Sequence, residues 1–507
     1  MIAIWNGLNS LNNYINRFLF KGLQPIEGFA LRNEWLVLGL LFVINVVVRS
    51  IMLDYDSIFL DEGQTLFQIN RPVERIIFGY CKGQQNAPLY FVLMHYWVKL
   101  VGLSVWKARF FSVLCFSGAA VVFYRFIRKN LGALYALAGS AVFLLSYRYL
   151  FFSHEARGYG LIILLAICSF NLFADLLSKP SRKKAIWLGV VNLAIIYTHY
   201  LTIYLFVVQG LVSLTMLNGN RKAFWQYVVS QLVVVALFLP WLKVVFSVMP
   251  EMGNYWVPKS TFNALYGIIV DIMGTKSGAL QSLLIVGVGL LSYLFSIKSR
   301  TKLKSQMLLL LLFWGVGIFL MHYSLGIYKP VFIYKYALYG SLGYLILILA
   351  VIKLLPIANI LRFTVAVIFI TTIGLRFRFE TPKREDWKTA VAQTKEWKND
   401  NTLILLQASY TYKCFATYWD ITLLNDPKKT FNKMIELGIH GVDHGANIET
   451  LVNGRNYEQI ILLRAHEGNP RGKLKAELDQ LYRESTNRED IRGIKMHLYD
   501  LSKSSQH

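Results

Sequence analysis

Long apolar runs recur along this chain of 507 residues and limit how it can fold. A helix needs about 20 mostly apolar residues to cross the hydrocarbon core of a bilayer. The segments closest to this requirement are 34–53, 107–127, 131–151, 157–177, 185–198, 199–217, 224–247, 278–297, 307–325, 333–353 and 356–376. The sequence therefore predicts a polytopic α-helical membrane protein with about 11 transmembrane helices.

Two stretches leave this count open. Residues 185–217 are too long for one helix, and Thr198-His199-Tyr200 offers a break between two spans. Residues 262–273 form a shorter apolar piece, which would suit an additional short or re-entrant helix. The predicted number of spans depends on how these two stretches fold.

The composition also favours a membrane protein over a soluble one. Hydrophobic residues make up 55% of the chain and charged residues 16%, whereas soluble domains carry roughly 25% charged residues. The formal net charge is +24, which in a soluble protein would point to nucleic acid. Much of the basic excess lies in short loops between apolar runs, where it orients the protein. Nucleic acid is therefore not an expected partner.

The amphipathic segment Pro88–Gly102 decides which loops face which side, because it could either cross the bilayer or lie at its surface. If it lies at the surface, the short basic connections share one side, as the positive-inside rule requires. These connections are 125–130, 178–184, 218–222 and 298–304. We therefore expect an interfacial helix within one outer loop, 54–106, on a multi-pass protein of the cell (inner) membrane. The candidate site and the C-terminal region would face the periplasm.

From about Phe377 the chain becomes richer in charge. Residues 1–376 are therefore predicted to form a transmembrane catalytic domain, and residues 377–507 a soluble outer α/β domain. Its expected elements are helices near 384–398 and 472–484 and strands at Thr402–Gln407, Gln459–Arg464 and near 493–500. No glycine-rich loop follows a strand in this region, so a nucleotide site is not expected.

The four cysteines show neither a metal-binding nor a disulfide-framework spacing. Cys115 and Cys168 lie inside apolar runs, and Cys81 and Cys414 lie outside them. A Cys81–Cys414 disulfide would be compatible with an oxidising compartment, but four unrelated thiols are the preferred interpretation.

Acidic residues begin the predicted outer loop. Asp54 and Asp56 are most simply explained as charges that keep the loop in water. Asp61 and Glu62 are different, because they are embedded in the apolar sequence 58–67 at the membrane surface. Carboxylates in such surroundings cost free energy unless they have a partner or a task.

A second acidic point lies at the outer turn near residue 155, where His154, Glu155 and Arg157 adjoin. A polar helix cap explains this group about as well as a functional site does. The predicted topology nevertheless places Asp61 and Glu155 on the same side of the membrane. Two carboxylates there could share a divalent metal ion or divide the roles of base and orienting group.

Basic residues mark the outer end of the 333–353 span. Lysines that extend toward the interface explain Lys329 and Lys335 without any function. Lys335, however, lies within the apolar register next to Tyr336. A cation in this position would suit a lipid-borne phosphate.

The order of these motifs resembles a known class of proteins. The motifs are Asp61-Glu62, Asn86-Ala87-Pro88-Leu89-Tyr90, Trp106–Arg109, Ser153–Tyr159 (SHEARGY), Thr198-His199-Tyr200, Lys335-Tyr336 and Arg384-Glu385-Asp386-Trp387. Together they resemble membrane glycosyltransferases of the GT-C fold, in particular bacterial relatives of protein O-mannosyltransferases and of the lipid A aminoarabinose transferase. The resemblance covers nearly the whole chain.

The resemblance compares five residues of this sequence with positions that such enzymes have in common. Asp61 would be the general base or the carboxylate that orients the acceptor, and Glu155 would match the second acidic position of the family. Lys335 stands where an arginine is usual and would contact the donor phosphate as a point charge. His199 matches a histidine often found there, whereas His154 stands in place of the usual glutamine. The residues expected to bind substrate are Glu62, His154, Arg157, His199, Lys329, Lys335 and Tyr336.

The resemblance also implies a reaction. A sugar would pass, with inversion, from a polyprenyl-phosphate donor to a lipid, glycan or protein acceptor at the outer face, alongside membrane lipids. Metal use varies in such enzymes, so no cofactor is certain and a divalent metal ion held by Asp61 and Glu155 is an option. Two alternatives are a transporter or flippase of lipid-linked saccharides and a non-catalytic membrane scaffold that binds envelope polymers.

Overall fold

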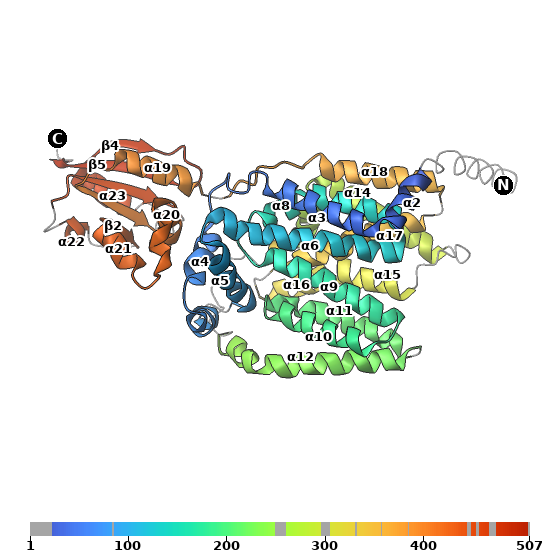
Figure 1. Cartoon of the computed structure of the whole chain (residues 1–507). Helices are drawn as coiled ribbons and strands as arrows, with labels where there is room; N and C mark the ends of the chain where they lie inside the picture. Colours follow the sequence, from blue (N-terminus) through green and yellow to red (C-terminus); the bar gives the residue numbers. More distant parts are fainter. Residues whose placement is uncertain are drawn as a thin grey trace.

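The computed structural model describes residues 23–83, 86–217, 219–248, 260–295, 305–329, 332–355, 357–383, 385–443, 448–452, 456–465 and 473–504. A bundle of helices forms the larger part, and a small α/β domain lies at one end of it (Figure 1). Helices α4 (Leu60–Ile69) and α5 (Leu89–Val101) lie between these two parts.

Six described helices are long and apolar enough to cross a membrane. They are α6 (Val105–Leu131), α9 (Tyr159–Ser178), α12 (Arg221–Val248), α14 (Lys276–Phe295), α15 to α16 (Ser305–Tyr328) and α17 (Tyr334–Leu354). Counting two bent pairs as spans raises the number to eight: α2 (Gln24–Arg32) with α3 (Glu34–Ser50), and α7 (Ala133–Leu145) with α8 (Tyr147–Ser153). The chain is a multi-pass membrane protein, and the count of 11 spans stays a prediction.

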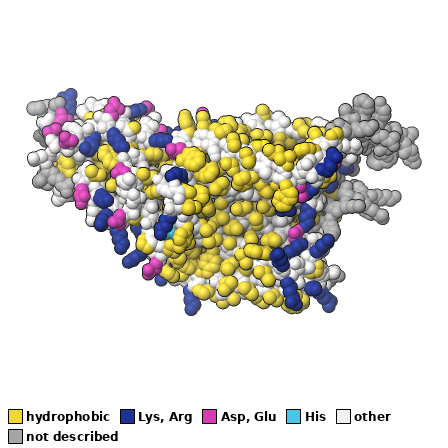
Figure 2. Space-filling model, in the orientation of Figure 1, with side chains coloured by type: hydrophobic (Ala, Val, Ile, Leu, Met, Phe, Trp, Pro, Cys, Tyr) yellow, Lys and Arg dark blue, Asp and Glu magenta, His cyan; other side chains and the backbone are white. Residues whose placement is uncertain are grey.

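The remaining predicted spans fold as shorter helices. They are α10 (Arg182–Ile196), η3 with α11 (Tyr200–Thr202, Ile203–Ser213) and α18 (Asn359–Gly374), and α13 (Phe262–Met273) is a further short apolar helix. The predicted break near His199 is confirmed, because α10 ends at Ile196 and η3 begins at Tyr200. Apolar side chains cover much of the bundle surface, as expected of helices that face lipid (Figure 2).

Close helix packing in the bundle centres on α17. Of its membrane-length apolar stretch, 94% is buried. A Cβ atom on Gly315 would lie 2.5 Å from the backbone nitrogen of Tyr344, so only glycine permits this approach. Small residues at such crossings are the usual means of packing transmembrane helices. The N-terminal end of α17, which carries Lys335, therefore belongs to a buried and closely packed helix.

Helix α5 has 13 residues, which gives a length of about 20 Å. A hydrocarbon core of about 30 Å is too thick for it to cross. Gly102, with a φ angle of 82°, ends the helix because glycine tolerates this conformation. The length of α5 agrees with the predicted interfacial position of Pro88–Gly102.

The α/β domain contains one five-stranded sheet with the order β2-β1-β3-β5-β4. Its strands are β1 (Thr402–Gln407), β2 (Ile439–Val442), β3 (Gln459–Arg464), β4 (Tyr482–Arg488) and β5 (Lys495–Ser504). β1 pairs in parallel with β2 and β3, and β5 pairs antiparallel with β3 and β4. The bounds of β1 and β3 are as predicted, but the sequence analysis did not identify β2 and β4.

The helices of this domain are α19 (Trp387–Trp397), α20 (Tyr412–Trp419), α21 (Thr430–Glu436), α22 (Ile448–Val452) and α23 (Lys473–Leu481). Two of them match the predicted helices near 384–398 and 472–484. α19 begins after Asp386, whose side chain accepts a hydrogen bond from the Thr389 backbone N–H, a typical helix N-cap. The proposed division of the chain between residues 376 and 377 stays a prediction.

The α/β domain contacts the predicted outer loop through buried polar groups. The Ser57 hydroxyl donates to Asp386 Oδ1 at 2.8 Å, and Arg492 Nη2 donates to Asp56 Oδ1 at 3.0 Å. Asp56 is only 6% exposed, so its predicted role as a charge that merely keeps the loop in water is wrong. The loop and the domain are therefore joined by directional contacts.

Helices α4 and α20 approach each other closely at one glycine. A Cβ atom on Gly63 would lie 2.7 Å from the Cys414 sulfur, so a larger residue would displace α20. All four cysteines are free thiols. The preferred interpretation of four unrelated thiols is confirmed, and the alternative Cys81–Cys414 disulfide is not formed.

Candidate active site

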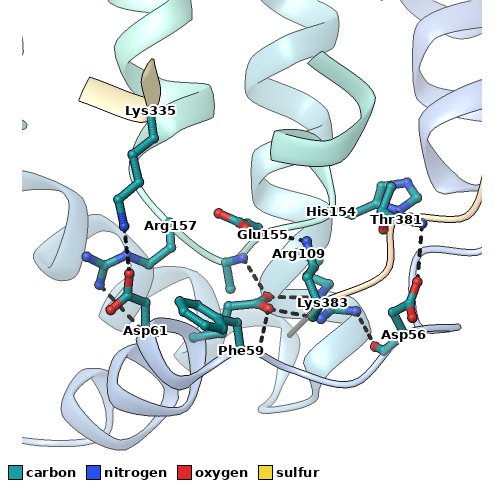
Figure 3. A network of polar contacts seen from close by, with 12 residues as sticks. Asp56, Phe59, Asp61, Arg109, His154, Glu155, Arg157, Lys335, Thr381 and Lys383 are labelled. Carbon is teal, nitrogen blue, oxygen red and sulfur yellow. Dashed lines mark hydrogen bonds and ion pairs between the residues drawn. The ribbon is translucent and has the colours of Figure 1, made fainter. Parts of the chain in front are cut away.

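Asp61 lies in the first turn of α4 between two cations (Figure 3). Lys335 Nζ, in the first turn of α17, is 3.3 Å from Asp61 Oδ2. Burial opposes ionisation of Asp61, but the charges of Arg157 and Lys335 outweigh it and lower the pKa of this carboxyl. The Asp61 side chain keeps 36% of its surface exposed. It is therefore an ionised carboxylate that a substrate can reach.

Arg157 joins the turn before α9 to helix α4. Its Nη1 donates to the Thr65 hydroxyl at 3.2 Å and approaches the Asp61 backbone carbonyl at 3.5 Å. The guanidinium also lies over the Phe91 ring of α5, 5.8 Å from its centroid. Arg157 thus brings together α4, α5 and the start of α9, and it directs positive charge toward Asp61.

Glu62 and Arg109 form a fully buried ion pair, with side chains 0% and 1% exposed. Arg109 Nε donates to Glu62 Oε1 at 2.8 Å, and Arg109 Nη2 donates to Glu62 Oε2 at 3.0 Å. The backbone N–H groups of Phe59 and Ala156 donate to the same carboxylate at 3.1 and 2.9 Å. These four bonds join the start of α4, the turn before α9 and helix α6.

The other N–H groups of Arg109 hold the segment that precedes α4. They donate to the backbone carbonyls of Leu53, Asp56 and Ser57 at 2.9, 2.9 and 3.1 Å. The oxygens of Glu62 are buried and bind these protein donors, and its substrate-binding role stays a prediction. Glu62 and Arg109 fix the position of the neighbouring Asp61.

Glu155 is 8% exposed, and its Oε1 lies 3.5 Å from Lys383 Nζ. Lys383 comes from the segment between α18 and the α/β domain, and its Nζ also lies 3.9 Å from the centroid of the Phe151 ring. Burial raises the pKa of Glu155, although the Lys383 charge acts in the opposite direction. Two carboxylates with pKa values shifted in opposite directions, Asp61 and Glu155, lie in one polar network (Figure 3).

His154 is completely buried and makes two hydrogen bonds. Its Nε2 donates to the Arg49 backbone carbonyl at 2.9 Å, so its Nδ1 accepts from the Thr381 hydroxyl at 3.1 Å. Burial, together with the charges of Lys383 and Arg109, lowers the pKa of His154 to about 3. Its predicted substrate-binding role does not fit these contacts, because both ring nitrogens bind the protein.

We expect His154 to make stability depend on pH. Its pKa is below the unfolded value of about 6.5, so its stabilising contribution is complete above pH 6.5 and declines as pH falls toward 3. At pH 5 the loss would be on the order of 2 kcal/mol. Thermal unfolding of the full chain in detergent at pH 7.5 and pH 5 measures it. His154→Gln should unfold with a smaller difference between the two pH values, and an equal difference would contradict the assignment.

The remaining predicted site residues differ in position. His199 caps η3 by accepting from the Leu201 N–H at 3.3 Å, and its ring centroid lies 5.1 Å from that of Tyr336. Tyr336 follows Lys335, whose Nζ lies 5.5 Å from the centroid of the tyrosine ring. His199 and Tyr336 therefore lie next to the Asp61–Lys335 pair.

Lys329 follows the last residue of α16 and is exposed, so the structure does not bring it into the buried polar network.

The sequence analysis did not assign a role to Arg109 or Lys383. Arg109 appeared only within the Trp106–Arg109 motif, although an arginine in an apolar span near a boundary is itself an indication of a buried partner. Lys383 stands in a short charged segment 228 residues after Glu155. Nothing in the local pattern identified it as a partner of Glu155.

The side chains at Asp61 and Glu155 do not fit a divalent metal ion. Among the described residues, no group of three or more His, Cys, Asp or Glu side chains could hold one. Lys335 and Arg157 lie against Asp61, and Lys383 lies against Glu155. These positively charged side chains favour an anionic ligand over a metal ion.

No protein-family model matches this chain, and no curated protein matches it. Among solved structures, ArnT from Cupriavidus metallidurans in the apo state matches 94% of this chain and 100% of its own, with 12% identity and a TM-score of 0.46. ArnT bound to undecaprenyl phosphate matches 92% and 98%, with 12% identity and a TM-score of 0.43.

The Archaeoglobus fulgidus oligosaccharyltransferase in complex with Zn and sulfate matches 83% of this chain and 67% of its own, with 11% identity and a TM-score of 0.45. ArnT is the lipid A aminoarabinose transferase, so the structural matches include a protein that the sequence motifs resemble.

Proposed function

We propose that this chain is a membrane glycosyltransferase that moves a sugar from a polyprenyl-phosphate donor to an acceptor hydroxyl, with inversion at the anomeric carbon. The observation that carries the proposal is a reachable carboxylate, Asp61, placed between the cations Lys335 and Arg157 at the end of a membrane helix bundle. Such a transfer needs a group that takes a proton and positive charge on the leaving phosphate.

The resting contacts suggest how the donor would prepare the site. Lys335 Nζ lies 3.3 Å from Asp61 Oδ2, and both side chains are partly exposed. A donor phosphate that draws Lys335 and Arg157 toward itself would weaken their hold on Asp61. The pKa of Asp61 would then rise, and this carboxylate would become a better proton acceptor.

The proposed transfer is a single displacement. The acceptor oxygen forms a bond to the anomeric carbon while the bond from that carbon to the phosphate oxygen breaks. The hydroxyl proton passes to Asp61, and the electron pair of the broken bond stays on the polyprenyl phosphate, beside Lys335 and Arg157. Glu155, with its raised pKa, would hydrogen-bond a sugar or acceptor hydroxyl next to this path.

A membrane-borne donor also accounts for where these residues lie. Lys335 is in the first turn of α17, a helix of membrane length, and Asp61 is on α4 next to the short helix α5. A phosphate at this level leaves its polyprenyl chain in lipid and its sugar in water. The same placement supports a candidate site at the outer face, as the basic loops predict.

The proposal is tested by turnover of polyprenyl-phosphate sugars by the full chain in lipid vesicles, with wild type and Lys335→Gln. Losing a hydrogen bond to a charged group costs about 1.5–3 kcal/mol, so kcat/KM for the donor should fall by about 10- to 100-fold. Lys353→Gln is the matched control, because it removes the same charge from the same helix about 27 Å away. It should turn over like wild type.

Two outcomes would overturn the proposal. Equal kcat/KM for Lys335→Gln and wild type would remove the phosphate contact. If wild type turned over no lipid-linked sugar but moved it across the bilayer, the transporter alternative would replace the transferase. The scaffold alternative would follow if the chain bound envelope polymers and showed neither activity.

A further inference from the structure

A groove of about 560 Å³ runs between α10 and α12. Mostly apolar side chains line the groove. Several of these side chains are more than half exposed, including Ile186, Trp225, Val229 and Leu237. Both helices belong to the membrane bundle. Apolar surface of this kind faces lipid chains there, and a groove in it has room for one of them.

One end of the groove carries positive charge. Arg182 lies in the first turn of α10 and Lys222 lies in the first turn of α12, and both line the groove. The groove extends from these cations to Leu193 on α10 and Leu237 on α12. Its length is therefore about 16–22 Å, which resembles the reach of one acyl chain across half a bilayer.

A polar group near the cations has no hydrogen-bond partner among the residues that the structure describes. The Oε1 atom of Gln226 is buried and has no hydrogen bond, and Gln226 lines the groove one helical turn from Lys222. The exposed Trp225 stands beside it, and tryptophan prefers the level of lipid headgroups. A donor from outside the chain would satisfy this oxygen.

We infer that the α10–α12 groove binds one anionic phospholipid of the phosphatidylglycerol type. The phosphate lies between Arg182 and Lys222, a headgroup hydroxyl donates to Gln226 Oε1, and an acyl chain fills the apolar length of the groove. Basic pockets between membrane helices favour anionic headgroups in this way. The site is separate from the candidate active site and does not depend on the proposed function.

The far end of the groove connects to the candidate site. The Tyr197 hydroxyl donates to the Leu237 backbone carbonyl at 3.0 Å, and Trp241 Nε1 donates to the Tyr200 hydroxyl at 2.6 Å. Tyr197 and Tyr200 flank His199 in the sequence, and the ring of His199 adjoins that of Tyr336. A lipid bound between α10 and α12 would therefore also stabilise the segment between α10 and η3, which contains His199.

The test measures lipid retention by the full chain in nanodiscs that contain equal amounts of phosphatidylglycerol and phosphatidylcholine, followed by native mass spectrometry. Wild type should keep one phosphatidylglycerol in preference to phosphatidylcholine. The double variant Arg182→Gln/Lys222→Gln should lose about 30-fold in affinity for phosphatidylglycerol. Lys183→Gln is the matched control, because it removes one exposed charge next to Arg182 that does not line the groove.

A second variant separates loss of the site from loss of folding. Val229→Trp should block the apolar length of the groove from its exposed side and lower retention while both cations remain. Equal retention of the two lipids by wild type would overturn the inference. Unchanged retention by the double variant, or an equal loss in Lys183→Gln, would overturn it as well.

Discussion

Asp61→Asn is expected to lower kcat for sugar transfer by about 10²–10⁴-fold, the usual contribution of a positioned general base. The change keeps the size of the side chain and removes only its charge. The amide oxygen of the new side chain could still lie near Lys335, but an amide could not accept a proton from the acceptor. Donor binding should persist, because Lys335 and Arg157 remain.

The matched control is Asp54→Asn. Asp54 belongs to the same acidic segment, but its side chain is 43% exposed and lies 3.9 Å from the surface lysine Lys388. Exposed pairs of this kind contribute little to stability, and the variant should turn over like wild type. If Asp61→Asn kept activity within a few-fold of wild type, the base would have to be another group, and Glu155 would be the next to test.

Arg109→Met is expected to destabilise the protein by about 3–5 kcal/mol, because it leaves the Glu62 carboxylate buried without its partner. It also removes the donors that hold the carbonyls of Leu53, Asp56 and Ser57. Thermal unfolding of the full chain in detergent measures the loss. Limited proteolysis should then cut within residues 54–60 faster than in wild type.

A second substitution shows whether the buried charge causes the loss. The double variant Arg109→Met/Glu62→Gln removes both charges and should recover part of the stability. Arg125→Gln on the same helix, which is 51% exposed and pairs with Glu34, should stay within about 1 kcal/mol of wild type. A wild-type unfolding temperature for Arg109→Met would contradict the role assigned to the pair.

Much of the candidate site could be predicted from the sequence because membrane topology restricts where loops can lie. Assigning the basic loops to one side placed Asp61, Glu155 and Lys335 on the other. The structure brings Asp61 and Lys335 to 3.3 Å. The catalytic roles of Asp61 and Glu155 stay predictions.

The contacts that hold the site could not be predicted in this way. Arg109 and Glu62 are 47 residues apart, and Lys383 and Glu155 are 228 residues apart. Hydropathy reports only how each segment prefers lipid or water, and it does not show which buried charges pair. For the same reason His154 looked available for substrate, although Arg49 and Thr381 occupy its ring nitrogens.

The missed strands have local reasons. β2 has only four residues, and β4 (YRESTNR) has no apolar alternation because most of its side chains are exposed at the edge of the sheet. Short and polar strands form because neighbouring strands offer hydrogen bonds, which a local pattern does not reveal. The strands β1 and β3 were predicted because they are buried and apolar along their length.

The segment between α3 and α4 joins the two parts of the protein. Ser57 and Asp56 bind the α/β domain, while Arg109 holds the same few residues against the membrane bundle. Asp61 lies four residues after Ser57 in the sequence. A force on the α/β domain would therefore reach Asp61 through only a few hydrogen bonds. Neither half of the protein could be cut away or exchanged without disturbing the other.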